Sequence, residues 1–312
     1  MRLVETAGNP APEGAVVGQM AALGGVNVRI CLWPQTGLIA RGTVCLFSGA
    51  GEFIEKYFET VRDLRKRGFA VATMDWRGQG GSDRLLPDPN KGHVEDFADY
   101  ESDLRKFMAE IVLPKCPGPY YAMAHSMGGH ILLRSALTEA GAFKRLIVSA
   151  PMVDISRNLT QAPFLRLLIE LLVLVGFEDA YVPGGGGHPR GLDPFGPTSL
   201  SSDPVRYQRI REVLKTLPGL GLGAQTMGWL RAASHSIVQI NTPSLFTSLK
   251  VPTFIVAAGS DIIASTPVAE RFAARFGNCQ IRVVAGARHE LLLERDELRD
   301  QFWAAFDAHI GA

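Results

Sequence analysis

Short runs of consecutive apolar residues alternate along most of this chain with stretches in which apolar residues recur every three or four positions. Continuous apolar runs of this length are typical of strands buried on both faces, as in a parallel sheet. Six runs have this form: Thr43–Phe47, Ala70–Met74, Tyr120–Ala124, Arg145–Ser149, Thr253–Ala257 and Ile281–Val284. The pattern therefore predicts six buried strands.

Helical periodicity separates these runs. It is clearest from Phe97 to Ile111, where apolar residues share one helix face, and Pro114 predicts the end of that helix. Near the N-terminus, Gly14–Leu23 and Asn27–Trp33 flank a Gly-Gly pair, which predicts two antiparallel strands joined by a turn. Four further helices are expected: from Tyr57 to near Gly68, Gly128–Leu137, Val268–Phe276 and Glu294–Ile310.

The alternation is interrupted between Pro151 and about Lys250, where a run of four glycines, several prolines and amphipathic helical segments occur instead. Alternating strands and helices predict a mostly parallel sheet with helices on both faces. We therefore expect an α/β fold with an eight-stranded sheet. Residues 1–150 and 251–312 would form it, and residues 151–250 would form an inserted helical cap.

Composition narrows the class of protein. A chain of 312 residues can bury a large core without disulfides or metals. The 32 Lys and Arg residues against 31 Asp and Glu residues argue against a nucleic-acid binder, and 20% charged residues argue against disorder. The four cysteines are isolated in the sequence, so we expect reduced core residues of a cytoplasmic protein.

The most apolar stretch, Phe164–Phe177, is too short for a membrane-spanning helix of about 20 residues and carries Arg166 and Glu170. It predicts a buried helix or one that faces an interface. The N-terminal segment lacks an apolar core, so no signal peptide is expected. A cytoplasmic location follows, compatible with transient contact at a membrane surface.

A candidate nucleophile lies where the strand ending at Ala124 runs into the predicted helix. Residues 124–128, Ala-His-Ser-Met-Gly, match the G-x-S-x-G nucleophile elbow with alanine in place of the first glycine. The turn requires small neighbours because strand and helix approach closely there. Small-Ser-Gly turns also occur by chance, but the position after a buried strand favours Ser126 as a nucleophile.

Acyl transfer also needs donors for the developing oxyanion. The backbone N–H of Met127, the residue after the nucleophile, is one candidate. The second is expected in the loop after Thr43–Phe47, which is rich in small residues, and we assign it to the N–H of Ala50. An ordinary glycine-rich turn is the alternative for this loop. It lacks the pattern of a phosphate-binding loop.

Two late segments supply a candidate acid and base. Asp261 follows the strand Thr253–Ala257, and His289 follows the strand Ile281–Val284, so both are expected at the same sheet edge as Ser126. Asp154 is a rival acid because it follows another strand. Two other histidines receive structural interpretations: His125 as a packing residue that points away from the site, and His93 as a loop hydrogen-bonder. No metal-ligand spacing occurs, so we expect no metal.

With these motifs in place, the chain resembles the monoacylglycerol lipase and bacterial lysophospholipase branch of the α/β-hydrolase superfamily, which has the order Ser, Asp, His. The matching segments are residues 49–52 (GAGE), 74–83 (MDWRGQGGSD), 125–129 (HSMGG) and 286–292 (GARHELL). The family usually has His-Gly where this chain has Ser48-Gly49. The resemblance implies hydrolysis of single-chain glycerol esters or lysophospholipids without a cofactor.

The cap is expected to select the substrate. Phe164, Leu165 and Leu168 are spaced to share an apolar helix face, which predicts contacts with an acyl chain and with a membrane or micelle. Plain packing of this helix onto the sheet domain is the alternative.

The leading hypothesis is a serine hydrolase of carboxylic esters, with Ser126, His289 and Asp261 as its triad. A thioesterase, an acyltransferase or a carbon–carbon bond hydrolase would use the same residues. An aminopeptidase is disfavoured because no acidic set for a substrate amine is evident. A serine at the elbow excludes chemistry that needs an aspartate there. A non-catalytic ligand-binding protein is the alternative of another class, and labelling of Ser126 by a fluorophosphonate would separate it from an enzyme.

Overall fold

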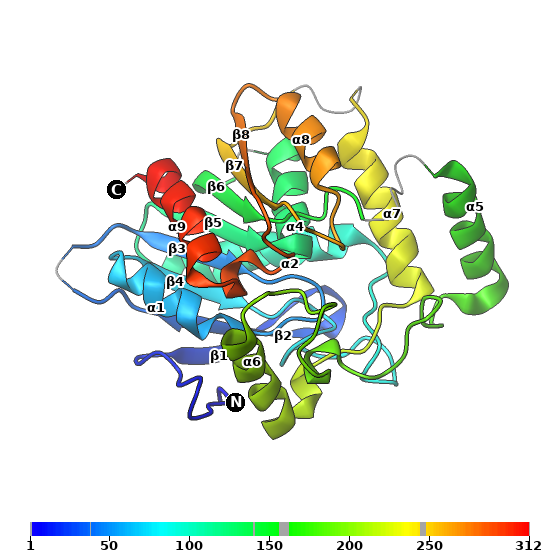
Figure 1. Ribbon diagram of the computed structural model, residues 1–312, viewed down its shortest axis with the longest axis horizontal. Coiled ribbons are helices and arrows are strands. Elements are labelled where there is room, and N and C mark those ends of the chain that lie inside the picture. Colours follow the sequence, from blue (N-terminus) through cyan, green and yellow to red (C-terminus); the bar gives the residue numbers. More distant parts are fainter. Residues whose placement is uncertain (1, 38, 140, 156–161, 244–247, 312) are drawn as a thin grey trace.

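A computed structural model of the chain describes residues 2–37, 39–139, 141–155, 162–243 and 248–311. Within this part of the chain, eight strands form one sheet in the order β1-β2-β4-β3-β5-β6-β7-β8 (Figure 1). Their bounds are β1 Val16–Ala21, β2 Asn27–Trp33, β3 Thr43–Phe47, β4 Ala70–Met74, β5 Tyr120–His125, β6 Phe143–Ser149, β7 Thr253–Ala258 and β8 Cys279–Val284. The predicted strands are confirmed, and those at 43–47 and 70–74 have the predicted ends. The strand at 281–284 was expected to be buried, but β8 lies at the edge of the sheet, and Gln280, Arg282 and Val283 are exposed.

The register of the sheet places several strand ends side by side. The β1–β2 and β2–β4 pairs are antiparallel, and the other neighbouring pairs are parallel. Phe47 at the end of β3 pairs with Ala124 of β5, which in turn pairs with Val148 of β6. Ala258 of β7 pairs with Val284 of β8. The loops that follow β3, β5, β7 and β8 therefore leave the same edge of the sheet.

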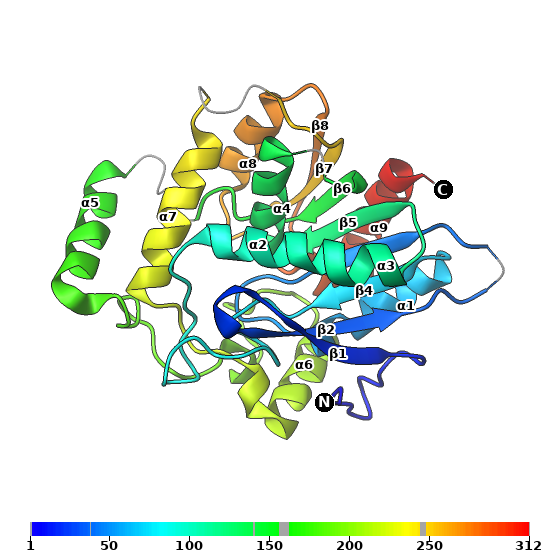
Figure 2. The same ribbon diagram turned by 180° about the vertical axis from the view of Figure 1, so that it is seen from behind.

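Helices cover both faces of the sheet because both faces of its strands are apolar. On one face Val44, Leu46 and their neighbours pack with α1 (Phe58–Lys66) and α9 (Asp296–Ile310). On the other face Cys45 and Phe47 belong to a core shared with α2 (Phe97–Phe107), α4 (Ser126–Thr138) and α8 (Thr266–Ala274). Figure 1 shows α1 and α9 in front of the sheet, and Figure 2 shows α2 and α4 from the opposite side.

The helix that begins at Phe97 passes the predicted stop at Pro114. A π-helical turn at Met108–Val112 follows α2, and α3 (Leu113–Lys115) continues it. Pro114 is the last residue but one of this continuous helical stretch, since Cys116 is extended. The predicted end is therefore confirmed to within one residue, because the helix ends at Lys115.

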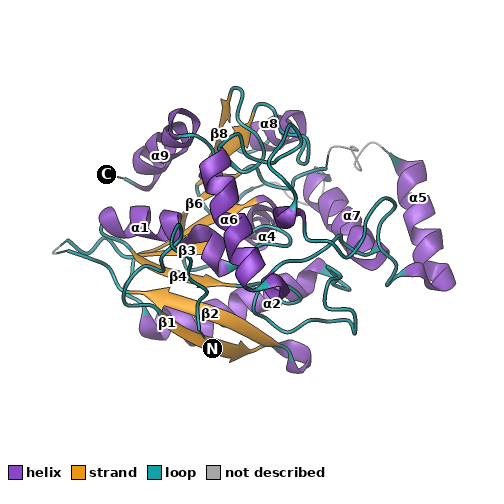
Figure 3. Cartoon of the chain, turned by 60° about the horizontal axis from the view of Figure 1, so that its bottom comes forward, coloured by secondary structure: helices purple, strands orange, loops and turns teal. Residues whose placement is uncertain are grey.

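Between β6 and β7, the described residues contribute helices but no strand of the sheet. The longer ones are α5 (Pro163–Leu172), α6 (Pro204–Thr216) and α7 (Met227–Asn241), and Figure 3 shows α6 apart from the neighbouring α7 and α5. α5 packs on α7 and lies beyond it, away from the sheet, in all three views. The division at residues 150 and 250 stays a prediction, and it agrees with this element order.

Among the described residues, no helix combines the length and the apolar character needed to cross a bilayer.

Candidate active site

Ser126 occupies a strained turn between β5 and α4. Its φ angle is +50°, in the left-handed region that L residues rarely adopt, and its side chain is nearly buried. A Cβ at Gly128 would lie 2.5 Å from the carbonyl oxygen of Ser48, so this position requires glycine. Ala124 fits at the first small position, where it is fully buried between β3 and β6. The geometry is that of a nucleophile elbow.

The loops after β7 and β8 bring Asp261 and His289 to this turn. His289 Nε2 lies 3.0 Å from Ser126 Oγ, and His289 Nδ1 lies 2.7 Å from Asp261 Oδ2. In the sequence, Ser126 and His289 are 163 positions apart, and Asp261 and His289 are 28 positions apart. This hydrogen-bonded series lets the histidine accept the serine proton while the carboxylate stabilises the imidazolium.

The surroundings of Asp261 keep it ionised. Burial raises the pKa of the Asp261 carboxyl, but the hydrogen bond with His289 and the backbone N–H donors of Ile263 and Ala264 outweigh burial. The pKa therefore lies below its usual value. Its side chain is 1% exposed, so water contributes little to solvating the charge, and these protein donors replace it.

The rival acid, Asp154, is bound elsewhere. Its Oδ1 accepts a hydrogen bond from the N–H of Ile155 at 2.8 Å, and its carbonyl accepts one from Ser265. Asp154 is fully buried beneath the loop that carries Asp261. The structure thus brings Asp261 to His289, in agreement with the assignment made from sequence order.

The loop after β3 lies against Ser126 and presents one unused backbone donor. The N–H of Gly49 donates to Glu52 at 2.5 Å, and the N–H of Gly51 donates to Gln79 at 3.0 Å. Among the described residues, the N–H of Ala50 between them has no hydrogen-bond acceptor. Met127 belongs to the first turn of α4, whose N–H groups have no partner within the helix. Both assigned donors are therefore available to an oxyanion.

A buried ion cluster supports this loop and was missed by the sequence analysis. The Glu52 carboxylate accepts hydrogen bonds from Tyr57 and, at 2.7 Å, from Lys56 Nζ. Lys56 Nζ also donates to Glu290 at 2.7 Å. Burial alone would raise the pKa of Glu52, but the Lys56 charge and these hydrogen bonds lower it to about 2. The spacing of Glu52 and Lys56 was the available signal, whereas Glu290 lies 234 positions away from Lys56.

His125 is buried as expected but does not point away from the site. Its ring packs on that of His289 with centroids 4.8 Å apart, and its Nδ1 lies 3.2 Å from the carbonyl oxygen of Ser149. Burial lowers its pKa to about 4, so the ring is neutral at pH 7. His93 bonds to Thr226 at 2.8 Å, which confirms its structural role.

Ser126 opens into a cavity of about 390 Å³. Its walls come from the loop after β3, residues 189–191, α6, the segment 221–225 and the start of α7, among other segments. The large apolar lining residues include Phe53, Met152, Val182, Leu214, Leu222, Trp229 and Leu230. Phe164, Leu165 and Leu168 are not among the lining residues, and Phe164 is 80% exposed. The expectation that these three contact the acyl chain is corrected, because α7 lies between α5 and the sheet and supplies the wall itself.

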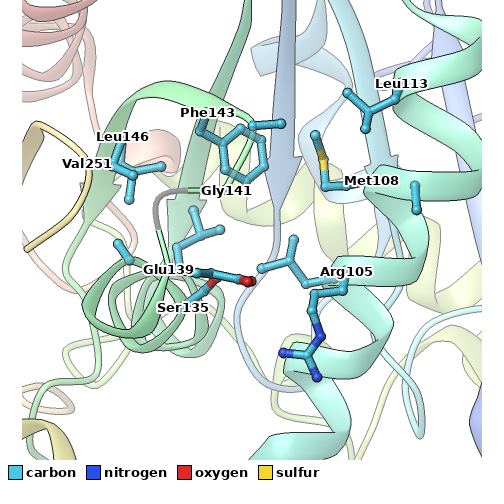
Figure 4. Close-up of a pocket in the computed structure, with 14 residues that line it drawn as sticks. Arg105, Met108, Leu113, Ser135, Glu139, Gly141, Phe143, Leu146 and Val251 are labelled. Atoms are coloured by element: carbon cyan, nitrogen blue, oxygen red, sulfur yellow. The ribbon is translucent and has the colours of Figure 1, made fainter.

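A second cavity of about 180 Å³ lies between α2, α4 and the start of β6, as Figure 4 shows. Its lining side chains include Met108, Leu113, Phe143 and Val251, with Arg105 and Glu139 beside them. Among the described residues that line it there is no histidine, and no hydrogen bond joins Ser135 Oγ to Glu139. Nucleophile, base and cavity coincide at Ser126. Among the described residues, no group of three His, Cys, Asp or Glu side chains is placed to hold a metal ion.

Comparison with known proteins shows the family of the chain. The family described as "Serine aminopeptidase, S33" (Hydrolase_4) matches residues 39–296. Lysophospholipase L2 of Escherichia coli (strain K12) is 31% identical over 82% of this chain and 76% of its own length. A probable lysophospholipase L2 of Haemophilus influenzae is 26% identical over 87% of this chain and 83% of its own.

The fold is shared with a solved enzyme. The structure of a soluble variant of monoglyceride lipase from Saccharomyces cerevisiae, in complex with a substrate analogue, superposes with a TM-score of 0.72. It covers 95% of both chains at 18% sequence identity. The chain therefore has the α/β-hydrolase fold and belongs to the Hydrolase_4 family, in the branch that includes lysophospholipase L2 and monoglyceride lipase homologues.

Proposed function

We propose that this protein hydrolyses the carboxylic ester of a single-chain lipid, a lysophospholipid or a monoacylglycerol, through an acyl-enzyme on Ser126. The observation that carries the proposal is the hydrogen-bonded series from Ser126 through His289 to Asp261, which ends in a mostly apolar cavity. The printed names of the relatives, lysophospholipase and monoglyceride lipase, support the substrate class.

In the proposed reaction, His289 Nε2 accepts the Ser126 proton while Oγ attacks the ester carbonyl. The N–H groups of Ala50 and Met127 donate to the oxyanion, and each such donor is worth roughly 3–4 kcal/mol in the transition state. His289 then returns the proton to the leaving alcohol as the ester bond breaks. Water, deprotonated by the same histidine, releases the fatty acid and regenerates Ser126.

The family description raises aminopeptidase activity, and the charges of the cavity disfavour it. A substrate amine needs an unpaired carboxylate. The lining carboxylates among the described residues are Glu52 and Glu290, and Lys56 bonds to both. Thioester hydrolysis and acyl transfer remain as outcomes of the substrate test below.

The function is tested with a substrate panel on the purified protein. Monoacylglycerols and lysophosphatidylcholines with matched acyl chains are expected to be hydrolysed, whereas aminoacyl p-nitroanilides are not, because the leaving amine and the substrate ammonium find no partner. Acyl-thioesters and an added alcohol acceptor form two further arms. Cleavage confined to the aminoacyl or thioester arm would contradict the proposal.

We also propose that α5 rests on a lipid surface during turnover. α5 and the π-helical turn that follows it (Val173–Phe177) leave a row of large apolar side chains exposed. Phe164 and Leu174 are 80% and 81% exposed, and the row continues through Leu167, Leu168, Leu171, Val175 and Phe177. A contiguous apolar row of this kind is typical of a membrane or partner interface. A cytoplasmic protein with peripheral contact at the membrane fits this arrangement.

Replacing Phe164 and Leu174 together by serine is expected to weaken co-sedimentation with phosphatidylglycerol vesicles about tenfold or more, because two large apolar contacts with the lipid are lost. Hydrolysis of a water-soluble p-nitrophenyl ester should stay unchanged. Val205→Ser is the matched control, since Val205 on α6 is also well exposed but lies outside the row. Equal vesicle binding by the double variant and the wild type would contradict this contact.

A further inference from the structure

The wall of the cavity carries an uneven distribution of charge. Glu52, Lys56 and Glu290 form one buried cluster in which two carboxylates share one ammonium. Lys56 is therefore not free to bind an anion that enters the cavity. Binding of an anionic group in this cavity therefore needs a second cation.

Arg190 supplies such a cation. It lines the same cavity and is exposed to solvent. Among the described residues, its guanidinium has no carboxylate, carbonyl or aromatic partner, whereas Lys56, the other lysine or arginine of the lining, is fully engaged. A guanidinium at the cavity with all five N–H donors free is suited to an oxyanion ligand.

The backbone around Arg190 is held in place by α6. Tyr207 Oη donates to the carbonyl oxygens of Asp193 at 3.0 Å and Arg190 at 3.4 Å, and Arg211 Nε donates to that of Leu192 at 3.1 Å. Gly191 lies against Leu214, so closely that a Cβ there would be 2.5 Å from Leu214 Cδ1. The turn that carries Arg190 is thus packed onto α6.

α6 is in turn anchored to the sheet domain by ion pairs. Arg206 bonds to Glu59 at 2.8 Å and to Asp296 at 2.6 Å, and Arg209 bonds to Glu59 at 2.6 Å. The N–H of Glu290, next to His289, donates to the carbonyl oxygen of Leu200 at 2.8 Å. Arg190 is therefore positioned relative to the triad by a connected set of hydrogen bonds and ion pairs.

We propose that Arg190 binds the phosphate of a lysophospholipid headgroup and makes the cavity selective for phosphorylated over neutral single-chain esters. In a lysophospholipid only the glycerol carbons separate the phosphate from the acyl ester. When the ester reaches Ser126, the phosphate must lie within the cavity or at its opening, where Arg190 stands. This inference rests on the proposed function, which names the ester but not the headgroup.

The binding test uses ether analogues that no esterase cleaves. 1-O-Dodecyl-lysophosphocholine and 1-O-dodecylglycerol share the chain and the glycerol, and they differ in the phosphate-bearing headgroup. Arg190→Ala should weaken binding of the phosphorylated ether about 10- to 100-fold, as expected for lost charge-assisted hydrogen bonds. Binding of the alkylglycerol should change less than about twofold. Arg190→Lys should recover part of the loss because it restores the charge but not the planar fork.

Kinetics give a second readout. For Arg190→Ala, kcat/KM should fall for lysophosphatidylcholine and lysophosphatidic acid, mainly through KM, and stay unchanged for the monoacylglycerol of the same chain. Two phosphorylated substrates are used so that dependence on phosphate is separated from dependence on choline. Arg231→Ala is the matched control: Arg231 lies on α7, does not line the cavity and has no hydrogen bond or ion pair among the described residues.

The outcomes separate the two proposals. A loss confined to phosphorylated ligands supports the Arg190 site. Equal losses for both ethers, or no loss for either, overturn it. A wild-type protein that binds the ethers in the expected order but cleaves no ester would contradict the proposed hydrolysis and leave the headgroup site standing.

Discussion

Ester hydrolysis by Ser126→Ala is expected to fall by roughly 10⁶-fold, to the level left by binding and the oxyanion donors. The variant removes the atom that forms the acyl-enzyme, and no other hydroxyl among the described residues bonds to His289. The fold should persist because alanine keeps the Cβ that the strained φ of +50° already accommodates. The measurement is turnover of a monoacylglycerol and a lysophosphatidylcholine, with thermal unfolding as the check on folding.

Ser260→Ala is the matched control for this loss. Ser260 follows β7 at the same edge of the sheet, is exposed and makes no hydrogen bond to His289. It should retain wild-type turnover. A fluorophosphonate should label the wild type and Ser260→Ala but not Ser126→Ala. Near-normal turnover by Ser126→Ala would remove the nucleophile assignment, and the absence of labelling in the folded wild type would favour a non-catalytic binding protein.

Asp261→Asn is expected to lower kcat by about 10⁴-fold with little change in KM. The carboxylate holds the proton on His289 Nδ1, which leaves Nε2 free to accept the proton of Ser126. An asparagine amide can donate to Nδ1 instead, which stabilises the wrong tautomer and removes the charge that stabilises the imidazolium. The asparagine has nearly the same shape, so the variant tests charge and tautomer rather than packing.

Asp154→Asn is the control that separates the two candidate acids, with kcat calculated per mole of folded protein. Because Asp154 makes no hydrogen bond to His289, this variant should keep kcat within about tenfold of the wild type. The reverse pattern, with the larger loss at Asp154, would transfer the acid role to it. The pKa of Asp261 lies below its usual value, so any change in wild-type activity between about pH 5 and 8 belongs to another group.

Most of the sheet could be predicted because its signal is local. A strand buried on both faces needs mostly apolar residues in sequence, and β3 and β4 are buried along their whole length. The sequence also predicted that Ser126, Asp261 and His289 lie close together, since each follows a parallel strand and such strands end at a common edge of the sheet. In this case the topology of the sheet links the order of these residues in the sequence to their proximity in the folded chain.

The cap could not be predicted to the same depth. An apolar helix face shows that some surface will be covered, but not which surface covers it. The apolar stretch at α5 was expected to contact the acyl chain, yet α7 and α6 form that wall and α5 remains largely exposed. The choice depends on how the helices between β6 and β7 pack, which no local pattern encodes.

The sequence by itself determined the α/β architecture and predicted the elbow at Ser126 and the candidate acid and base that the fold brings beside it. It did so because strand burial, a strained turn and loop order each leave a signature within a few residues. Only the tertiary structure decided that Glu290 joins Glu52 and Lys56, that His125 packs on His289, and that Arg190 lines the cavity. Those relations join residues far apart in the chain, and their energies depend on burial and distance, which exist only once the chain has folded.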